Sequence, residues 1–337
     1  MANYTSGRND NYDRIIAMRI HILALNQVFD TGLSTLLDTF GTANTLAKST
    51  GAPSTRFNVT IVGVRSQVRT SHGLSVPVRL ATRLTRPDVV LVPALGAHMP
   101  ETLRSALERQ DITDAQMLLR EWSGSGTLVG TACTGTFVLA GTSLLNGHSA
   151  TTSWWLAPFF RERYPQVLLH DSKMLVSSSR FVTAGASLAH LDLVLWLIRR
   201  RSPSLAALTA RYLVIDQHPS QAAFMIPDHL AHSDPLVERF ERWARRHLAD
   251  GFSLSGAARA VVTSERTLAR RIHSVLGKSP LAYFQDLRVE RAVHLLQTSS
   301  ASVDQIASQV GYADGVTLRT LIRQKIGRGV RELRSRG

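Results

Sequence analysis

The sequence of 337 residues predicts two domains of different fold class, an α/β domain followed by an all-α domain. Three observations predict this division. Apolar strand-like runs alternate with helical patterns from Arg19 to about Arg200, helix-turn-helix patterns occur twice in the last hundred residues, and an interrupted stretch lies between them. We therefore expect the first domain at 19–201, a linker at 202–234 and the second domain at 235–337.

The first domain is expected to contain a mainly parallel sheet with helices on both faces, in a flavodoxin-like arrangement, because strands and helices alternate along the chain. The expected strands are Arg19–Leu25, Phe57–Val64, Val89–Pro93, Thr127–Thr131, Val167–Leu169 and Phe181–Thr183. The expected helices are Leu33–Ala47, Met99–Ser123, Gly135–Ala140, Trp154–Arg163 and Leu188–Arg200, with a further helix at Leu205–Ile215 in the linker. Residues 1–18 carry charges throughout and lack the apolar core of a signal peptide, so we expect a largely disordered extension.

A nucleophile elbow is predicted where the strand Thr127–Thr131 leads into Cys133. The small residues Thr134 and Gly135 open the next helix at once, which would place the cysteine on a sharp turn above a helix N-terminus. Helix N-terminal amides lower the pKa of a thiol, and this favours a thiolate at Cys133. A single cysteine excludes an intrachain disulfide framework and is typical of a reducing cytosol.

The elbow stretch Gly130–Ala140 resembles the PfpI-like domain of the class I glutamine amidotransferase-like superfamily. Further segments carry the resemblance: Phe29–Asp38, Arg69–Gly73, Asp88–Pro93, Ala150–Trp154 and Ala184–Asp192. Catalytically active relatives are expected to have a histidine base where this chain has Ser153, and no acid stands at Thr35–Leu37, the region that matches their supporting acid. A cysteine without a base loses much of its catalytic use, so we expect no catalytic residue and no enzyme. Cys133 is then either retained at an inherited elbow or contacts a ligand.

An effector pocket is expected at the carboxyl ends of the strands, because ligands of open α/β sheets bind there. The residues that would line it are Cys133, Thr134, Ser153 and Trp154. Trp154 and Trp155 would form an aromatic wall for a cationic or alkyl ligand, or serve as core or dimer contacts. No metal-ligating cluster and no dinucleotide motif is found in the sequence, and we expect neither a metal nor a cofactor.

The last hundred residues contain an internal repeat of two helix-turn-helix units, Ser253–Ile272 and Ser302–Ile322. In the second unit, Ser302 and Gln305 are predicted to form a capping box, and Gly311 to end the first helix in the left-handed conformation. A basic helix after a tight turn is typical of proteins that dock into the major groove of DNA. The alternative is a helical bundle with a solvated basic face.

A helix that begins at Ser279–Pro280 is expected to join the two units. The segment from about Asp234 to Arg336 resembles the AraC/XylS DNA-binding domain. The matching residues are Ser264–Arg270, Gly277–Pro280, Arg288–Ala292 with Leu295–Leu296, Val303–Ala307 and Val310–Tyr312. The resemblance implies seven helices, two of which read DNA. This chain departs from the family at two positions. Members carry a basic residue at the position of Thr320, which is here displaced to Arg319, and a proline at the position of Val330.

The expected DNA-contacting residues lie on the two reading helices. They are Ser264, Arg266, Thr267, Arg270, Arg271 and His273 on the first, and Gly315, Val316, Thr317, Arg319, Thr320 and Arg323 on the second. Charge supports a nucleic-acid partner, because the chain has a net charge of +14. The segment from residue 236 onward contributes +9 of it, from 18 basic and 9 acidic residues.

The two resemblances together cover nearly the whole chain and imply the layout of GlxA-type transcriptional regulators, a group that includes sensors of arginine, carnitine and glycine betaine catabolism. We therefore expect a cytoplasmic activator that binds double-stranded promoter DNA, recruits RNA polymerase and responds to a small effector, for which the resemblance favours a nitrogenous molecule. It would form a homodimer through its N-terminal domain. The most continuous apolar run, Leu191–Ile198, is too short to span a membrane, so no membrane partner is expected.

Two alternative functions remain at this point. The first is a cysteine-dependent hydrolase or amidase of the PfpI type fused to a DNA-binding head. The second is a ligand-independent regulator that is governed by its own abundance or by cysteine oxidation.

Overall fold

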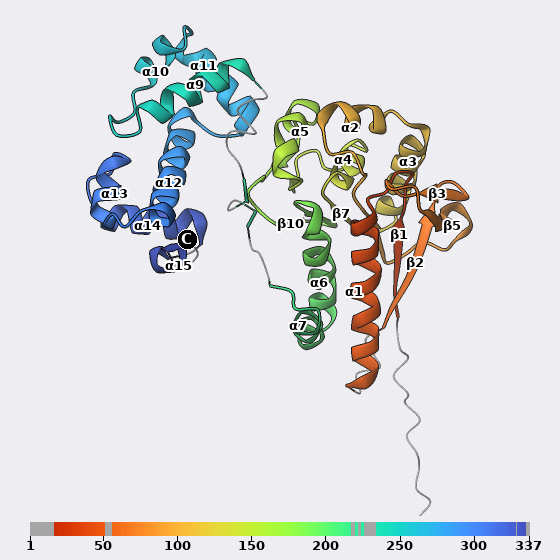
Figure 1. The fold of residues 1–337 in the computed structure, drawn as a ribbon. Helices are drawn as coiled ribbons and strands as arrows, with labels where there is room; N and C mark the ends of the chain where they lie inside the picture. Colours follow the sequence, from red (N-terminus) through yellow and green to blue (C-terminus); the bar gives the residue numbers. More distant parts are fainter. Residues whose placement is uncertain are drawn as a thin grey trace, which may run out of the picture.

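The computed structural model describes residues 17–50, 56–216, 220–221, 224–225, 234–327 and 329–334. An α/β unit is followed by a set of helices (Figure 1). The disorder expected for the N-terminal extension lies outside the described residues, apart from the last two positions, and the first strand already begins at Met18.

A seven-stranded sheet forms the centre of the α/β unit, in the order β10-β11-β7-β6-β1-β2-β5. Its strands are β1 (Met18–Leu23), β2 (Phe57–Gly63), β5 (Arg79–Leu80), β6 (Val89–Val92), β7 (Leu128–Ala132), β10 (Leu175–Ser178) and β11 (Phe181–Ala184). All neighbouring pairs are parallel except β10 with β11. The predicted parallel sheet is confirmed, with an antiparallel edge strand that the sequence pattern did not indicate.

Two small sheets lie beside the main one. They pair β3 (Gln67–Arg69) with β4 (Ser75–Pro77), and β8 (Ser149–Ala150) with β9 (Leu168–Leu169). The strand predicted at Val167–Leu169 is therefore real, but it pairs only with β8 and not with the central sheet.

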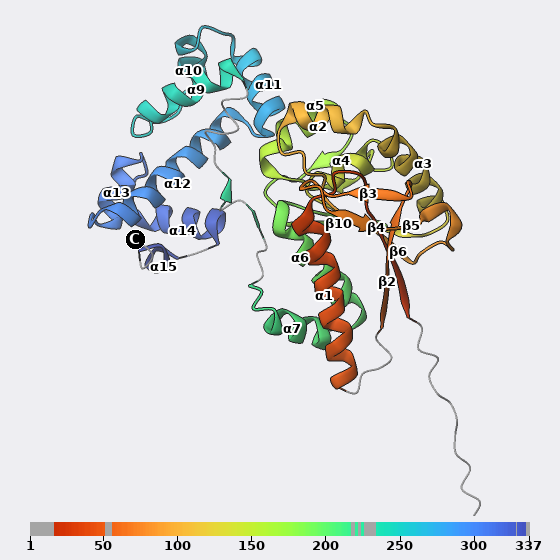
Figure 2. The same cartoon turned by 45° about the vertical axis from the view of Figure 1, so that its right-hand side comes forward.

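Helices cover both faces of the central sheet, as expected. One face packs on α1 (Asp30–Ser49), α6 (His190–Arg201) and α7 (Pro203–Tyr212), which lie together in Figure 2. The other face packs on α2 (Pro100–Leu107), α3 (Gln110–Gly124), α4 (Gly135–Ala140) and α5 (Ala157–Arg163). Alternate residues of β6 serve the two faces: Val90 and Val92 lie in one apolar cluster, Val89 and Leu91 in the other. This explains why the strand reads as a continuous apolar run.

The single helix predicted over Met99–Ser123 is wrong, because α2 and α3 are separate. Arg109 stands between them in an extended conformation. Its guanidinium donates to the backbone oxygen of Asn26 at 2.6 Å, to Gln27 at 2.9 Å and to Asp111 at 3.0 Å. These long-range bonds to the loop after β1 have no counterpart in local periodicity.

Two other helices of the α/β unit, α5 and α6, are each preceded by a short 3-10 turn. The turn η2 (Trp154–Leu156) leads into α5, and η3 (Ser187–Ala189) leads into α6. A third, η1 (Ala81–Arg83), follows β5.

Part of the expected linker belongs to the apolar core of the α/β unit. The helix predicted at Leu205–Ile215 is α7, and its residues Leu205 and Ala206 are buried in the cluster of α1 and α6. The proposed domain boundary near Asp234 remains a prediction; α9 begins directly after this residue, which caps it.

The C-terminal part contains seven described helices, in agreement with the expected number: α9 (Pro235–Arg246), α10 (Leu254–Ala260), α11 (Glu265–Leu276), α12 (Pro280–Thr298), α13 (Val303–Gln309), α14 (Gly315–Ile326) and α15 (Val330–Arg334). They form two apolar cores. Tyr283, Phe284 and Leu287 at the start of α12 belong to the first core, and Val289, Ala292 and Leu296 belong to the second. The helix α12 thus joins two helix-turn-helix units (Figure 1).

The helix signals predicted for this part are confirmed: Ser279 caps α12, and Ser302 with Gln305 forms a capping box at α13. Ser264 caps α11. Gly311 has a φ of +81°, and a Cβ there would lie 2.4 Å from the carbonyl oxygen of Leu248. Glycine is required at this turn for its backbone conformation and for the close approach.

A substitution in α1 tests the packing of this helix. A Cβ at Gly32 would lie 2.7 Å from Nε2 of the buried His190, whereas a Cβ at Gly41 would meet nothing within 4 Å. We expect Gly32→Ala to lower the free energy of unfolding by ~1–3 kcal/mol, because the ring must shift in a filled core. Gly41→Ala, the matched control, should raise it by up to ~1 kcal/mol through helix propensity. Urea unfolding measures both; equal effects of the two substitutions would contradict the packing described here.

Candidate functional site

The elbow after β7 is present as predicted. Cys133 has a φ of +54°, in the left-handed region that non-glycine residues rarely adopt, and α4 begins two residues later. A Cβ at Gly135 would lie 2.4 Å from the carbonyl oxygen of Val92, so only glycine lets the start of α4 approach the end of β6 so closely. The sequence from β7 to α4 therefore folds into the sharp turn that its small residues indicate.

The polar atoms around Cys133 are bonded within the protein. Its sulfur lies 2.8 Å from Oγ of Ser153, and its carbonyl oxygen accepts a hydrogen bond of 2.7 Å from the hydroxyl of Thr152. Thr134 donates its hydroxyl to the carbonyl oxygen of Leu95 at 2.9 Å and accepts from the amide of the same residue at 2.8 Å. Cys133, Thr134 and Ser153 are each at most 1% exposed.

Burial raises the pKa of the Cys133 thiol, and hydrogen bonds from Ser153 and Thr134 offset this only in part. The expectation of a thiolate favoured by the helix N-terminus is therefore wrong, because desolvation of the charged form outweighs the amides of the short helix α4. Neither His148 nor His72 stands in for the missing histidine base, because both make bonds elsewhere: His148 with Ser178 at 3.1 Å, and His72 with Asp30 at 2.8 Å. No histidine of the described residues is bonded to the sulfur.

His190 is a buried residue that the sequence analysis did not single out. Its Nδ1 donates to the carbonyl oxygen of Ser187 at 2.6 Å, and its Nε2 accepts from the amide of Ala94 at 3.2 Å. Burial lowers the pKa of His190 to about 4, so the ring is neutral near pH 7. It joins the loop after β6 to the loop after β11. Its position in the apolar segment Leu188–Leu193 was the feature of the sequence that could have indicated its burial.

Trp154, expected in the effector pocket, directly follows Ser153 in the chain but packs against the second domain. It is 8% exposed and belongs to the apolar core of the first helix-turn-helix unit, together with Val237 and Phe240. The neighbouring Trp155 donates its ring N–H to the carbonyl oxygen of His98 at 3.1 Å. The pocket at the elbow remains a prediction, and the structure places its tryptophan at the contact between the domains.

A second contact joins helix α5 of the first domain to α11, and both helices are seen together in Figure 2. Arg161 of α5 forms an ion pair of 2.5 Å with Asp171 and donates from its other terminal nitrogen to the carbonyl oxygen of Val275 at 3.3 Å. A Cβ at Gly277, the left-handed cap of α11, would lie 2.3 Å from the Arg161 guanidinium. The last turn of the first reading helix is thus bonded to the first domain.

The helix predicted to be the first reading helix, α11, presents Arg266, Arg270 and His273 to solvent. Among the described residues, neither Arg266 nor Arg270 has a hydrogen-bond or ion-pair partner. Ser264 accepts from the amide of Thr267 at 3.2 Å and donates to its hydroxyl at 2.9 Å, so both residues shape the start of the helix.

Arg271 differs from the other predicted DNA contacts. Its guanidinium pairs with Asp234, a carboxylate that is itself 4% exposed and caps α9. This places Arg271 in a bond between two helices of the first unit.

The second reading helix, α14, begins at Gly315, whose amide donates to Asp304 at 2.9 Å. A Cβ at Gly315 would lie 2.5 Å from that same oxygen, so glycine permits the contact. The exposed residues of this helix that were predicted to contact DNA are Val316, Thr317, Arg319, Thr320 and Arg323. The hydroxyl of Thr320 donates to the backbone of Val316 at 3.1 Å.

Among the described residues, no group of three or more His, Cys, Asp or Glu side chains has an arrangement that would hold a metal ion. None of the described helices is long and apolar enough to cross a membrane.

The buried His190 makes stability depend on pH. The folded chain keeps this ring neutral down to about pH 4, while the unfolded chain takes up a proton near the usual value of 6.5. The contribution of His190 to the free energy of unfolding is therefore fully present above pH 6.5 and is lost as the pH falls toward 4. The loss from this group amounts to about 3 kcal/mol. Urea unfolding at pH 4 to 7 measures it. His190→Asn keeps a donor and an acceptor without this titration, and should show a shallower pH dependence; an equal slope in both proteins would contradict the assignment.

Comparison with known proteins agrees with both parts of the fold. The DJ-1/PfpI family matches residues 18–199, and a helix-turn-helix domain family matches residues 257–336. The HTH-type transcriptional regulator ArgR of Pseudomonas aeruginosa is 26% identical over 223 residues, which are 65% of this chain and 68% of that protein. The HTH-type transcriptional regulator GbdR of the same organism is 25% identical over 214 residues, which are 62% of this chain and 57% of that protein. The match to GbdR thus spans little more than half of its length.

A solved protein from Vibrio parahaemolyticus shares the fold of the first domain. It has a TM-score of 0.50 and 18% identity, and the match covers 58% of this chain and 99% of that chain. The expected pairing of a PfpI-like domain with an AraC-type domain is confirmed. The chain belongs to the DJ-1/PfpI family, among the transcriptional regulators that join this domain to a C-terminal AraC-type helix-turn-helix domain.

Proposed function

We propose that this regulator binds double-stranded promoter DNA through α11 and α14, and that its DJ-1/PfpI domain is a sensor without enzymatic activity. The observation that carries the proposal is the pair of reading helices on one connecting helix, α12, each of which presents exposed arginines. Two such helices can enter successive segments of the major groove, about one helical turn or ~34 Å apart.

The chemistry of the exposed side chains supports base and phosphate contacts. Arg266 and Arg270 on α11, and Arg319 and Arg323 on α14, have no partner among the described residues. Their guanidinium groups can therefore bond to guanine edges or phosphate oxygens without first breaking a bond within the protein. Binding through such contacts should weaken steeply with salt.

The elbow supports a sensor and not an enzyme. The thiol of Cys133 is buried and has a raised pKa, and its bonded neighbour is Ser153, which takes up no proton near neutral pH. A cysteine in this state is a poor nucleophile. The competing function, a cysteine-dependent hydrolase or amidase fused to a DNA-binding head, requires the thiolate that this environment disfavours.

The remaining partners are part of the same proposal. The regulator acts as an activator that recruits RNA polymerase, responds to a small effector of nitrogenous chemistry and works in the cytoplasm, where its promoter lies. It forms a homodimer through residues 19–201, so that two pairs of reading helices bind with a higher effective concentration than one. Sedimentation of the full chain would show the dimer. A DNA footprint of the full chain that is only as long as one pair of reading helices can cover would contradict the dimer.

Neighbouring arginines of α11 provide a matched test of DNA binding. Arg270→Ala should weaken binding to a duplex selected from a random pool by about 1–3 kcal/mol, with unchanged stability, because an exposed base contact is lost. Arg271→Ala should lower stability instead, since it leaves the buried Asp234 without its cation. Gel-shift titration and urea unfolding of both variants separate the two effects. If Arg270→Ala binds like the wild-type chain, α11 is not a reading helix.

Cys133→Ser tests the non-enzymatic elbow. The substitution keeps a small polar side chain beside Ser153, so affinity for the selected duplex should remain within about twofold, since exchanges that keep the side-chain volume cost little. The wild-type chain should turn over peptide, amide and glyoxal substrates no faster than the variant. Turnover that disappears with the sulfur would establish the hydrolase and reject the sensor proposal.

A further inference from the structure

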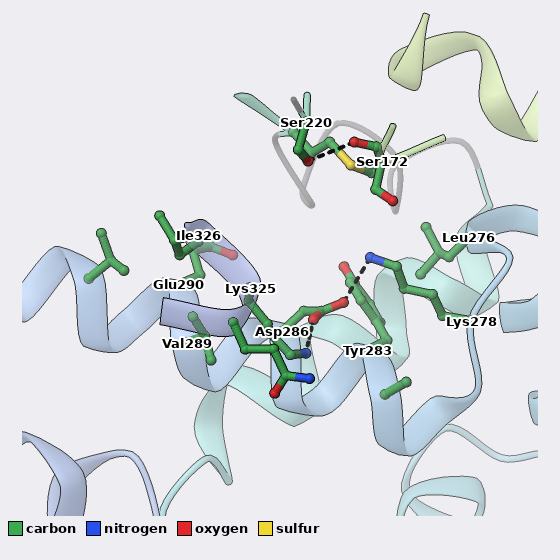
Figure 3. A pocket seen from close by; sticks show the side chains of 14 residues that line it. Ser172, Ser220, Leu276, Lys278, Tyr283, Asp286, Val289, Glu290, Lys325 and Ile326 are labelled. Atoms are coloured by element: carbon green, nitrogen blue, oxygen red, sulfur yellow. Dashed lines mark hydrogen bonds and ion pairs between the residues drawn. The ribbon is translucent and has the colours of Figure 1, made fainter. Parts of the chain in front are cut away.

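A cavity of about 560 Å³ lies between the helical domain on one side and the first domain and the linker on the other. Its walls come from α12, the ends of both reading helices, and a side formed by Ser172, Ser220 and Met225 (Figure 3). The volume is within the range of ~300–1,000 Å³ typical of small-molecule sites. Neither the elbow nor the DNA-reading surface includes this cavity.

The charged part of the wall is a carboxylate between two lysines. Asp286 of α12 bonds through one oxygen to Lys278 at 2.8 Å and through the other to Lys325 (Figure 3). The three side chains are between 22% and 32% exposed. An ammonium has three N–H donors, and each lysine gives one of them to Asp286, so this group carries a net charge of +1 and retains donors.

The other acid of the wall is Glu290, and both of its oxygens accept from Arg245 at 3.2 Å. Arg245 is shared, because it also pairs with Glu241 at 2.8 Å, and the second oxygen of Glu241 accepts from the hydroxyl of Tyr283 at 2.8 Å. The carboxylates that face the cavity therefore already have cations, while the two lysines can still donate. This favours an anion over a cation as the occupant.

Most of the remaining wall is apolar, from residues of the helical domain and from Met225 of the linker. It includes Met225, Leu276, Tyr283, Val289 and Ile326. A ligand with a hydrocarbon body would bury its surface against these side chains while its charged group faces the lysines.

We propose that this cavity binds a small organic monocarboxylate with an apolar body, held at its carboxylate by Lys278 and Lys325. The proposal rests on the proposed function, because the cavity would be a second effector site of the DNA-binding regulator, distinct from the site of its nitrogenous effector. It adds a ligand class and a location away from the elbow.

The position of the two lysines gives such a ligand a route to the DNA-reading surface. Lys278 follows Gly277, the cap of α11, and Lys325 lies in the last turn of α14. Asp286 thus attaches the ends of both reading helices to the connecting helix. A carboxylate that shares the lysines with Asp286 changes both attachments at once, and DNA binding and ligand binding must then affect each other reciprocally.

The opposite wall leads toward the elbow. The carbonyl oxygen of Ser172 accepts from the hydroxyl of Ser220 at 2.7 Å and from the amide of Gln221 at 2.9 Å. The side chain of Gln221 is 1% exposed and donates to the carbonyl oxygen of Thr152 at 2.9 Å. Thr152 in turn bonds to Cys133. An occupant of the cavity therefore touches a wall that is hydrogen-bonded to the elbow of the first domain.

The test uses octanoate as the probe and the full chain, with titration calorimetry as the measurement. Octanoate should bind saturably, and the neutral octanamide and cationic octylamine should bind at least about tenfold more weakly, because they lack the charge-assisted bonds. Lys278→Gln and Lys325→Gln should each weaken octanoate binding about tenfold for the same reason. Lys48→Gln, an exposed lysine at the end of α1, is the matched control and should leave it unchanged.

A second variant tests the location without removing a charge. Ala282 is half-buried and lines the cavity, so Ala282→Phe fills part of it and should abolish octanoate binding. Absence of saturable binding, equal affinity for octanoate and octanamide, or unchanged binding in Ala282→Phe would each overturn the proposal. Affinity for the selected duplex is measured separately without octanoate. A chain that binds DNA but not octanoate rejects this site alone, and one that binds octanoate but no DNA rejects the proposed function alone.

Discussion

The ion pair between Arg161 and Asp171 lies at the contact between the two domains of this regulator. It orients a guanidinium that also donates to the carbonyl oxygen of Val275, in the last turn of the first reading helix. Trp154, on the turn that precedes the same α5 helix, is buried in the core of the first helix-turn-helix unit. Ser153, which lies beside the Cys133 sulfur, and Trp154, which is buried in the core of the second domain, are consecutive residues of the chain. A change of packing at the elbow has a short mechanical path to the reading helix.

The features that could be predicted from the sequence are those set by a few neighbouring residues. The capping box of Ser302 and Gln305, the left-handed Gly311 and the short helix after Cys133 follow from local conformational preferences, and all three are present. The break at Arg109 could not be predicted, because it depends on bonds to residues more than 80 positions away. The antiparallel β10 was missed for a related reason, since a short edge strand carries little apolar pattern of its own.

The candidate sites divide in the same way. Helical periodicity predicts which side chains of α11 face outward, but it does not distinguish Arg270 from Arg271, which differ only through the distant carboxylate of Asp234. A helix N-terminus predicts a lowered thiol pKa, and only the burial of Cys133 in the folded chain reverses the sign. The lysines around Asp286 are 8 and 39 residues from it, so their meeting is visible in three dimensions and not in any motif.

The central claim is that the first domain is mechanically joined to the first reading helix. Hydrogen–deuterium exchange of the full chain tests it most directly, at the amides of the last turn of α11, where Gly277 donates to His273 at 2.8 Å. Removing the guanidinium with Arg161→Ala should speed exchange there, while Arg163→Ala, an exposed arginine on the same helix α5, should not. Unchanged exchange in Arg161→Ala would contradict the coupling, and would leave the two domains as independent units on one chain.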